Sequence, residues 1–143
     1  MKIAVMTLFI LIAAAACAQV DIAPAYTPKF PGDPAHSSAE ASALGYMRTV
    51  ASAQREYKKK HGGFATALSA LVGTGSFTRR MASTDRRDYE VKFHSTGKAY
   101  SLTLVPKQFD PGHRSFYTDE SGEIRSDDAK PATASSDPVN RKG

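Results

Sequence analysis

The chain has 143 residues, of which 41% are hydrophobic and 23% are charged, and its formal net charge is +5. This length and composition predict an ordinary globular protein with one small core. The single cysteine excludes an internal disulfide, and the modest positive charge permits contact with anionic polymers without indicating it.

Residues 1–18 are predicted to be a signal peptide. Lys2 is followed by an apolar run over residues 3–12 and then by small residues. The run is shorter than the roughly 20 apolar residues that a membrane helix needs. Cleavage before Gln19 would release a free protein, whereas cleavage before Cys17 would resemble a lipoprotein site and leave a lipid on that cysteine. Both remain open. Either way, we expect export to the periplasm, the cell surface or the medium, with membrane attachment only if Cys17 is lipidated.

Residues 19–36 contain four prolines and one glycine, which predicts an extended linker. A long helix follows over residues 37–61. Ser37 and Glu40 have capping-box spacing, in which the serine oxygen accepts a backbone amide and the carboxylate reaches back to the cap amide. Three lysines and a histidine occupy the last turn, and Gly62 suits a left-handed cap. One side of this helix carries the stripe Leu44, Met47, Val50, Ala51, Ala53, Gln54 and Tyr57.

The second half of the chain predicts strands. Residues 88–96 and 99–105 alternate apolar and polar side chains, with a hairpin signal at Gly97-Lys98 between them. Residues 114–126 predict a third strand, a turn at 120–122 and a short fourth strand around Ile124. Residues 64–87 contain a helical turn at 65–71 and a glycine-rich basic loop.

We therefore predict an α+β domain over residues 37–126, followed by a disordered polar tail over 127–143. In this domain one long N-terminal helix packs on a three- to four-stranded antiparallel sheet. The predicted contact joins Leu44, Met47, Val50, Ala51 and Tyr57 of the helix to Val91, Phe93, Leu102, Leu104 and Phe116 of the sheet.

The segment "ALGYMRTVASAQREYKKKHGGFATALSAL" resembles the helix and first loop of type IV pilins and type II secretion pseudopilins. The resemblance continues in "AYSLTLVP", "RSFYTDESGEIR" and "PATASSDP", and together these cover roughly residues 40–138. The chain lacks the usual prepilin N-terminal segment, which carries a glutamate and about twenty apolar residues. The resemblance implies a pilin-like domain with a structural or adhesive role, and pilus or secretion components as partners.

One acidic stretch has part of the spacing of a calcium loop. Asp119, Ser121 and Asp128 fall at its third, fifth and twelfth positions, but Tyr117 stands where the leading aspartate should be. The alternative is a hairpin turn, in which Asp119 caps and Gly122 supplies a positive φ.

Basic residues form a candidate anion-binding surface, with DNA or a polysaccharide as the polymer that it would contact. The alternative is a solvated charged face. The set comprises Arg55, Lys58, Lys59, Lys60, Arg79, Arg80, Arg86 and Arg87. The four histidines have no zinc-site spacing, and no nucleophile elbow or phosphate loop occurs. We therefore expect a non-enzymatic protein without a cofactor. A binding module of the periplasm, or an envelope lipoprotein, is the alternative to the pilin-like role.

Overall fold

We describe residues 25–140 from a computed structural model of the chain. The predicted signal peptide, both candidate cleavage sites and the candidate lipid site at Cys17 lie outside these residues. Within residues 25–140, no helix combines the length and the apolar character that crossing a membrane requires.

Helix α1 (Ser38–His61) begins and ends where the sequence predicts. The Ser37 Oγ accepts a hydrogen bond from the Glu40 backbone N–H at 3.1 Å. At the other end, Gly62 has a φ of 80° and its N–H donates to the Lys58 carbonyl at 2.8 Å. Both caps are therefore local features, fixed by residues that are neighbours in the sequence.

Six strands form one antiparallel sheet whose order follows the chain. They are β1 (Asp85–Arg86), β2 (Tyr89–Ser95), β3 (Tyr100–Pro106), β4 (Ser115–Asp119), β5 (Arg125–Asp127) and β6 (Asp137–Pro138). The two long central strands pair over seven residues, with Val91 opposite Leu104 and Phe93 opposite Leu102. The predicted hairpin at Gly97 is confirmed, since this glycine has a φ of 81° and the strands pair on either side of it.

The prediction of a three- to four-stranded sheet is wrong, because β1 and β6 extend the sheet at its two edges. Each has only two residues, too few for an alternating pattern to be recognised in the sequence. The described part of the predicted disordered tail, residues 127–140, is also incorporated into the fold. Its β6 pairs with β5, and Ala132 is buried.

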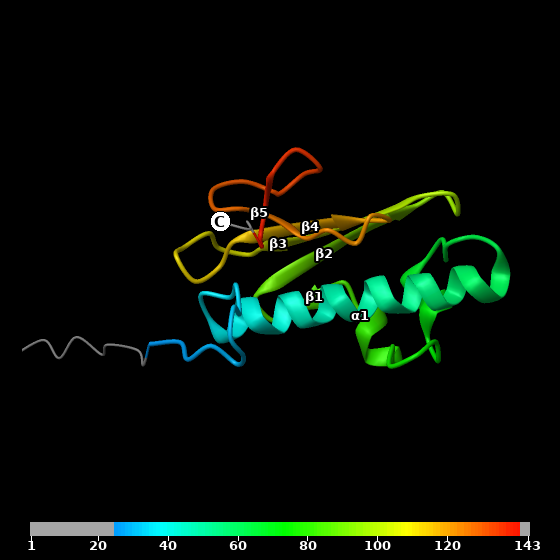
Figure 1. The fold of residues 1–143 in the computed structure, drawn as a ribbon, viewed down its shortest axis with the longest axis horizontal. Coiled ribbons are helices and arrows are strands. Elements are labelled where there is room, and N and C mark those ends of the chain that lie inside the picture. Colours follow the sequence, from blue (N-terminus) through cyan, green and yellow to red (C-terminus); the bar gives the residue numbers. More distant parts are fainter. Residues whose placement is uncertain (1–24, 141–143) are drawn as a thin grey trace, which may run out of the picture.

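The helix lies across one face of the sheet, while the segment between α1 and β1 passes along another side of the helix (Figure 1). That segment holds two short 3₁₀ helices, η1 (Leu68–Leu71) and η2 (Arg79–Ala82). The first overlaps the helical turn predicted at 65–71. The core combines apolar residues from all three parts: Leu44, Met47, Val50, Leu68, Leu71, Phe77, Val91, Leu102, Leu104 and Phe116. Tyr57 and Phe93, predicted as core contacts, are only partly buried at its margin.

Candidate functional site

The first turn of α1 is tied to the sheet by a buried ion pair between Glu40 and Arg114. Glu40 is 0% exposed, and its Oε2 lies 2.8 Å from the Arg114 Nη2. Its Oε1 accepts from the Arg114 Nε at 3.0 Å and from the backbone N–H of the same residue at 2.9 Å. Burial by itself raises the pKa of this carboxyl, but the hydrogen bonds from Arg114 and His36 outweigh it and hold the pKa below the usual value.

Hydrogen bonds made by Arg114 and Ser37 also fix the segment before the helix. The Arg114 Nη2 donates to the Pro34 carbonyl at 2.7 Å, and the Ser37 Oγ donates to the Gly112 carbonyl at 2.5 Å. The sequence predicts that Glu40 reaches back to the Ser37 amide, but the carboxylate instead accepts from the His36 N–H at 2.8 Å. The difference arises because Arg114, 74 residues further along the chain, draws the carboxylate toward β4.

Three further fully buried polar side chains also have structural partners. The amide of Gln54 both donates to the Ala65 carbonyl at 3.1 Å and accepts from the Ala65 N–H at 2.9 Å. The Ser115 hydroxyl donates to a β3 carbonyl and accepts from the Ala132 N–H, each at 2.9 Å. The Thr118 hydroxyl donates to the Glu123 carbonyl. Each of these side chains therefore finds a backbone hydrogen-bond partner in a different part of the chain, as buried polar groups require.

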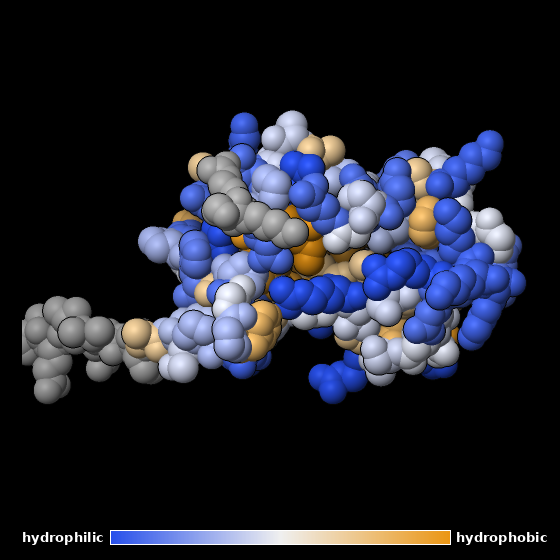
Figure 2. Space-filling model, viewed as in Figure 1, coloured by the Kyte–Doolittle hydropathy of each residue, from blue (hydrophilic) through white to orange (hydrophobic). Residues whose placement is uncertain are grey.

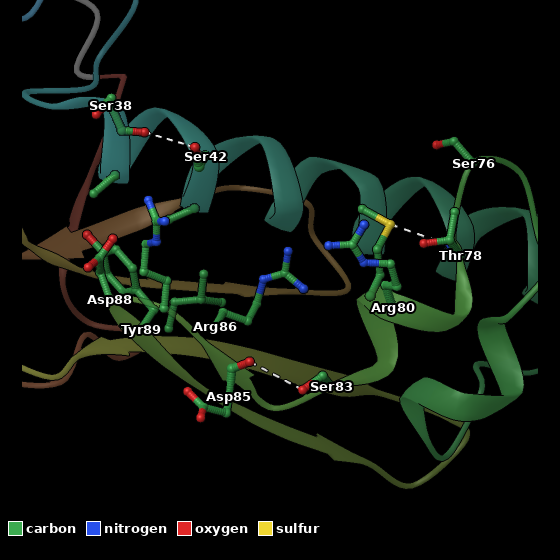
Figure 3. A pocket seen from close by; sticks show the side chains of 15 residues that line it. Ser38, Ser42, Ser76, Thr78, Arg80, Ser83, Asp85, Arg86, Asp88 and Tyr89 are labelled. Carbon is green, nitrogen blue, oxygen red and sulfur yellow. Dashed lines mark hydrogen bonds between the residues drawn. The ribbon is translucent and has the colours of Figure 1, made fainter.

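A groove of about 1,080 Å³ lies between the first half of α1 and the β1–β2 hairpin (Figure 3). We call it the hairpin groove. Most of its polar lining consists of hydroxyl groups and charged side chains. The lining residues include Ser38, Ser42, Ser76, Thr78, Arg80, Ser83, Asp85, Arg86, Arg87, Asp88 and Tyr89.

Three of the predicted anion-binding residues, Arg80, Arg86 and Arg87, line this groove. No guanidinium group of the three has a hydrogen bond or an ion pair with any of residues 25–140. The Arg86 guanidinium lies 4.0 Å from the centre of the Tyr46 ring. Because the Tyr46 hydroxyl donates to the Met81 carbonyl at 3.0 Å, the ring is held in place and orients the arginine above it.

The two carboxylates that line the hairpin groove differ in their partners. Asp85 is paired with Lys107, whose Nζ lies 2.7 Å from its carboxylate. Asp88, in the turn that joins β1 to β2, has no hydrogen-bond or ion-pair partner among the described side chains. The groove therefore offers three unpaired guanidinium groups and one unpaired carboxylate.

Two features of the hairpin groove carry a conformational or solvation cost. Arg87 has a φ of 35°, and it is the one non-glycine residue with a positive φ within residues 25–140. Tyr89 is 3% exposed, and its buried hydroxyl has no hydrogen-bond partner in the same part of the chain. Burial, followed by the nearby charge of Glu40, raises the pKa of this hydroxyl well above its usual value. Neither feature has a recognisable signal in the sequence.

The other predicted anion-binding residues lie elsewhere. Lys58, Lys59 and Lys60 are in the last turn of α1, where the Lys58 Nζ lies 4.5 Å from the Phe64 ring centre. Arg55 faces the β4–β5 turn, close to Gly122. Arg79 is exposed on η2 and does not line the groove. The structure thus divides the predicted surface into separate parts, of which the hairpin groove holds three arginines.

The view of the molecule in Figure 2 shows hydrophilic side chains over most of one face, with apolar atoms in a crevice between α1 and the C-terminal segment. A cavity of about 240 Å³ is lined by Leu44 of α1 and by Ile124 and Val139 of the C-terminal part of the chain. Charged side chains gather toward the end of α1, which agrees with the lysines of its last turn.

The candidate calcium residues are placed in and after the β4–β5 turn. The Asp119 carboxylate accepts from the Ser121 N–H at 2.9 Å, and the Gly122 N–H donates to the Asp119 carbonyl at 3.0 Å. Gly122 has a φ of 75°, as the hairpin-turn alternative requires. Asp128 is exposed beyond β5. Within residues 25–140, no three side chains of His, Cys, Asp or Glu are grouped so that they could hold a metal ion.

Comparison with known proteins adds no relative: no family model, curated protein or solved structure matches this chain.

Proposed function

We infer that this protein is an exported, non-enzymatic structural or interaction module of the cell envelope or surface, of the type IV pilin or type II secretion pseudopilin kind. The observation that carries the proposal is that the fully buried polar side chains are all hydrogen-bonded within the fold. Glu40, Gln54, Ser115 and Thr118 are each 0% exposed, and each is hydrogen-bonded to a backbone group outside its own helix or strand.

This pattern supports a scaffold role because a catalytic acid or base needs access to a substrate proton. The Glu40 carboxylate accepts four hydrogen bonds, one from His36 and three from Arg114. It therefore has no free position at which to exchange a proton. The resulting frame holds the helix at a fixed angle on the sheet and presents the outer surfaces rigidly to a partner.

Export and partner choice are tested together in the native host. Alkaline phosphatase fused after residue 140 is expected to be active, since that enzyme folds only outside the cytoplasm. A photo-crosslinking amino acid at Phe30 or Val72, the two large apolar side chains that are exposed within residues 25–140, is expected to form an adduct with a pilus, secretion or envelope component. The same label at Glu90, on the exposed side of β2, serves as the control.

An inactive phosphatase fusion, or adducts with cytoplasmic proteins alone, would contradict this proposal.

A second candidate function is favoured by the three unpaired arginines. In this alternative the protein is a periplasmic binding module or an envelope lipoprotein that contacts an anionic polymer. Binding driven by charge should weaken steeply as salt rises. Intact mass of the protein from the host envelope distinguishes the two forms, since a mass beginning at Gln19 indicates a free module and an acylated Cys17 indicates a lipoprotein.

A further inference from the structure

We propose that the hairpin groove binds an acidic segment of a glycan, with the guanidinium groups of Arg80, Arg86 and Arg87 contacting its carboxylate or sulfate groups. The proposal deepens the second candidate function, on which it rests, by naming the ligand class and its site.

The charged groups of the groove favour a ligand that carries both acidic groups and hydroxyls. Guanidinium forks bind carboxylate and sulfate oxygens through paired hydrogen bonds, and these three have no hydrogen-bond or ion-pair partner within residues 25–140, although Arg86 also contacts the Tyr46 ring. Ionised Asp88 can only accept hydrogen bonds. A sugar ring supplies the hydroxyl donors that such an acceptor needs, whereas the phosphodiester backbone of DNA carries none.

The neutral lining of the groove leads to the same ligand class. The hydroxyls of Ser38 and Ser76 line the groove without a partner in residues 25–140, and they can donate to or accept from sugar oxygens. Single-stranded nucleic acids bind through bases that stack on exposed aromatic faces. The Tyr46 ring lies under Arg86 and Tyr89 is 3% exposed, so neither tyrosine offers a free face to a base.

The positive φ of Arg87 is a backbone conformation that costs stability for any residue with a side chain. It is the first of two residues between β1 and β2, and two-residue hairpin turns favour glycine or asparagine where φ is positive. An arginine held in this conformation points to a role for its side chain rather than for its backbone.

Titration calorimetry of the purified full chain tests the proposal with defined probes. The acidic probes are tetragalacturonate, which carries carboxylates, and a heparin-derived tetrasaccharide, which carries sulfates. Maltotetraose is the neutral sugar control, and a single-stranded oligothymidylate is the polyanion control. We expect saturable binding of at least one acidic tetrasaccharide, weakening as salt rises, and no binding of maltotetraose.

Two neighbouring arginines of η2 form the matched pair of variants. Arg80→Ala removes a guanidinium that lines the groove, whereas Arg79→Ala removes an identical group that does not. We expect Arg80→Ala to weaken acidic tetrasaccharide binding about tenfold and Arg79→Ala to stay within about twofold of the original protein.

Arg87→Gly separates a binding role from a folding role. Glycine relieves the positive φ, so this variant should keep or raise the melting temperature. Its affinity for the acidic tetrasaccharide should nevertheless fall about tenfold. A loss of affinity that accompanied a lower melting temperature would instead assign Arg87 to the fold and overturn its place in the site.

The remaining outcomes distinguish this proposal from the function on which it rests. Equal losses from Arg79→Ala and Arg80→Ala would show a diffuse basic surface and overturn the groove. Tighter, Arg80-dependent binding of oligothymidylate would overturn the glycan assignment while leaving an anionic-polymer module standing. If neither acidic tetrasaccharide nor oligothymidylate binds, the proposal and the second candidate function both fail.

Discussion

Replacing Glu40 by glutamine isolates the charge of the buried ion pair while keeping the side chain's shape. The Glu40 carboxylate is 0% exposed and accepts four hydrogen bonds, three of them from Arg114. The single oxygen of a glutamine cannot accept all four, and its NH₂ group would face the donors of the arginine. The Arg114 guanidinium, whose side chain is 10% exposed, would then be left without a counter-charge.

Breaking a buried ion pair from one side costs about 3–5 kcal/mol, because the remaining charge stays desolvated. Domains of this size unfold with a free energy of roughly 5–15 kcal/mol, so Glu40→Gln should remove a large share of it. The corresponding fall in melting temperature is about 10–25 °C.

Urea denaturation followed by circular dichroism measures the difference in unfolding free energy. Glu90→Gln is the matched control, because Glu90 is exposed on β2 and is not a partner of Glu40 or Arg114. We expect the control to change the free energy of unfolding by less than about 0.5 kcal/mol. Equal effects of Glu40→Gln and Glu90→Gln would refute the reasoning that the pair holds the helix on the sheet.

Acid titration gives the same prediction a second readout. Hydrogen bonds to Arg114 and His36 outweigh burial and leave the pKa of Glu40 below 4.5 in the folded protein. The stability that this depressed pKa contributes is therefore present above the unfolded value and is lost as the pH falls through the lower, folded one. The difference in unfolding free energy between the original protein and Glu40→Gln should be constant near neutral pH and should shrink in acid. A difference that grew in acid would contradict the assigned sign.

Three more predictions test the buried Gln54 amide, the core and the tyrosines. Gln54→Leu leaves the Ala65 N–H and carbonyl unpaired, and should cost about 2–4 kcal/mol in urea denaturation; an unchanged midpoint would show that water replaces the amide. Leu102→Asp buries a charge at a fully buried position of β3 and should abolish cooperative thermal unfolding, so a soluble variant that melts cooperatively would place the core elsewhere. Burial raises the pKa of Tyr46 and of Tyr100 to about 12, so ultraviolet titration of the folded protein should show both ionising well above pH 10. The stability linked to these two groups is present below pH 10 and lost as pH rises toward about 12, and ionisation of every tyrosine near pH 10 in the folded protein would contradict it.

The sequence by itself determined the elements whose signals are local. Ser37 and Gly62 set the ends of α1, since a cap forms between a residue and the backbone a few positions away. The alternation of residues in β2 and β3 set which side chains are buried, and Gly97 set the hairpin between them. A regular period and a special turn residue can both be recognised within a short stretch of sequence.

Only the tertiary structure decided the strands at the two edges of the sheet. β1 and β6 each have two residues, and each forms because a longer neighbour offers it free backbone groups. The prediction of disorder over residues 127–140 failed for the same reason, since this segment is polar but Ala132 and β6 find partners on β4 and β5.

The candidate site was likewise predicted only in part from the sequence. The sequence singled out the basic residues, but it could not show that Arg80, Arg86 and Arg87 line one groove while Arg55 and the lysines of α1 lie elsewhere. It also recognised Glu40 only as a capping residue, because Arg114 is 74 residues away. Local hydrogen bonding and periodicity can be read from neighbouring residues, whereas a charge's partner and a groove's lining depend on which distant segments the packed core brings together.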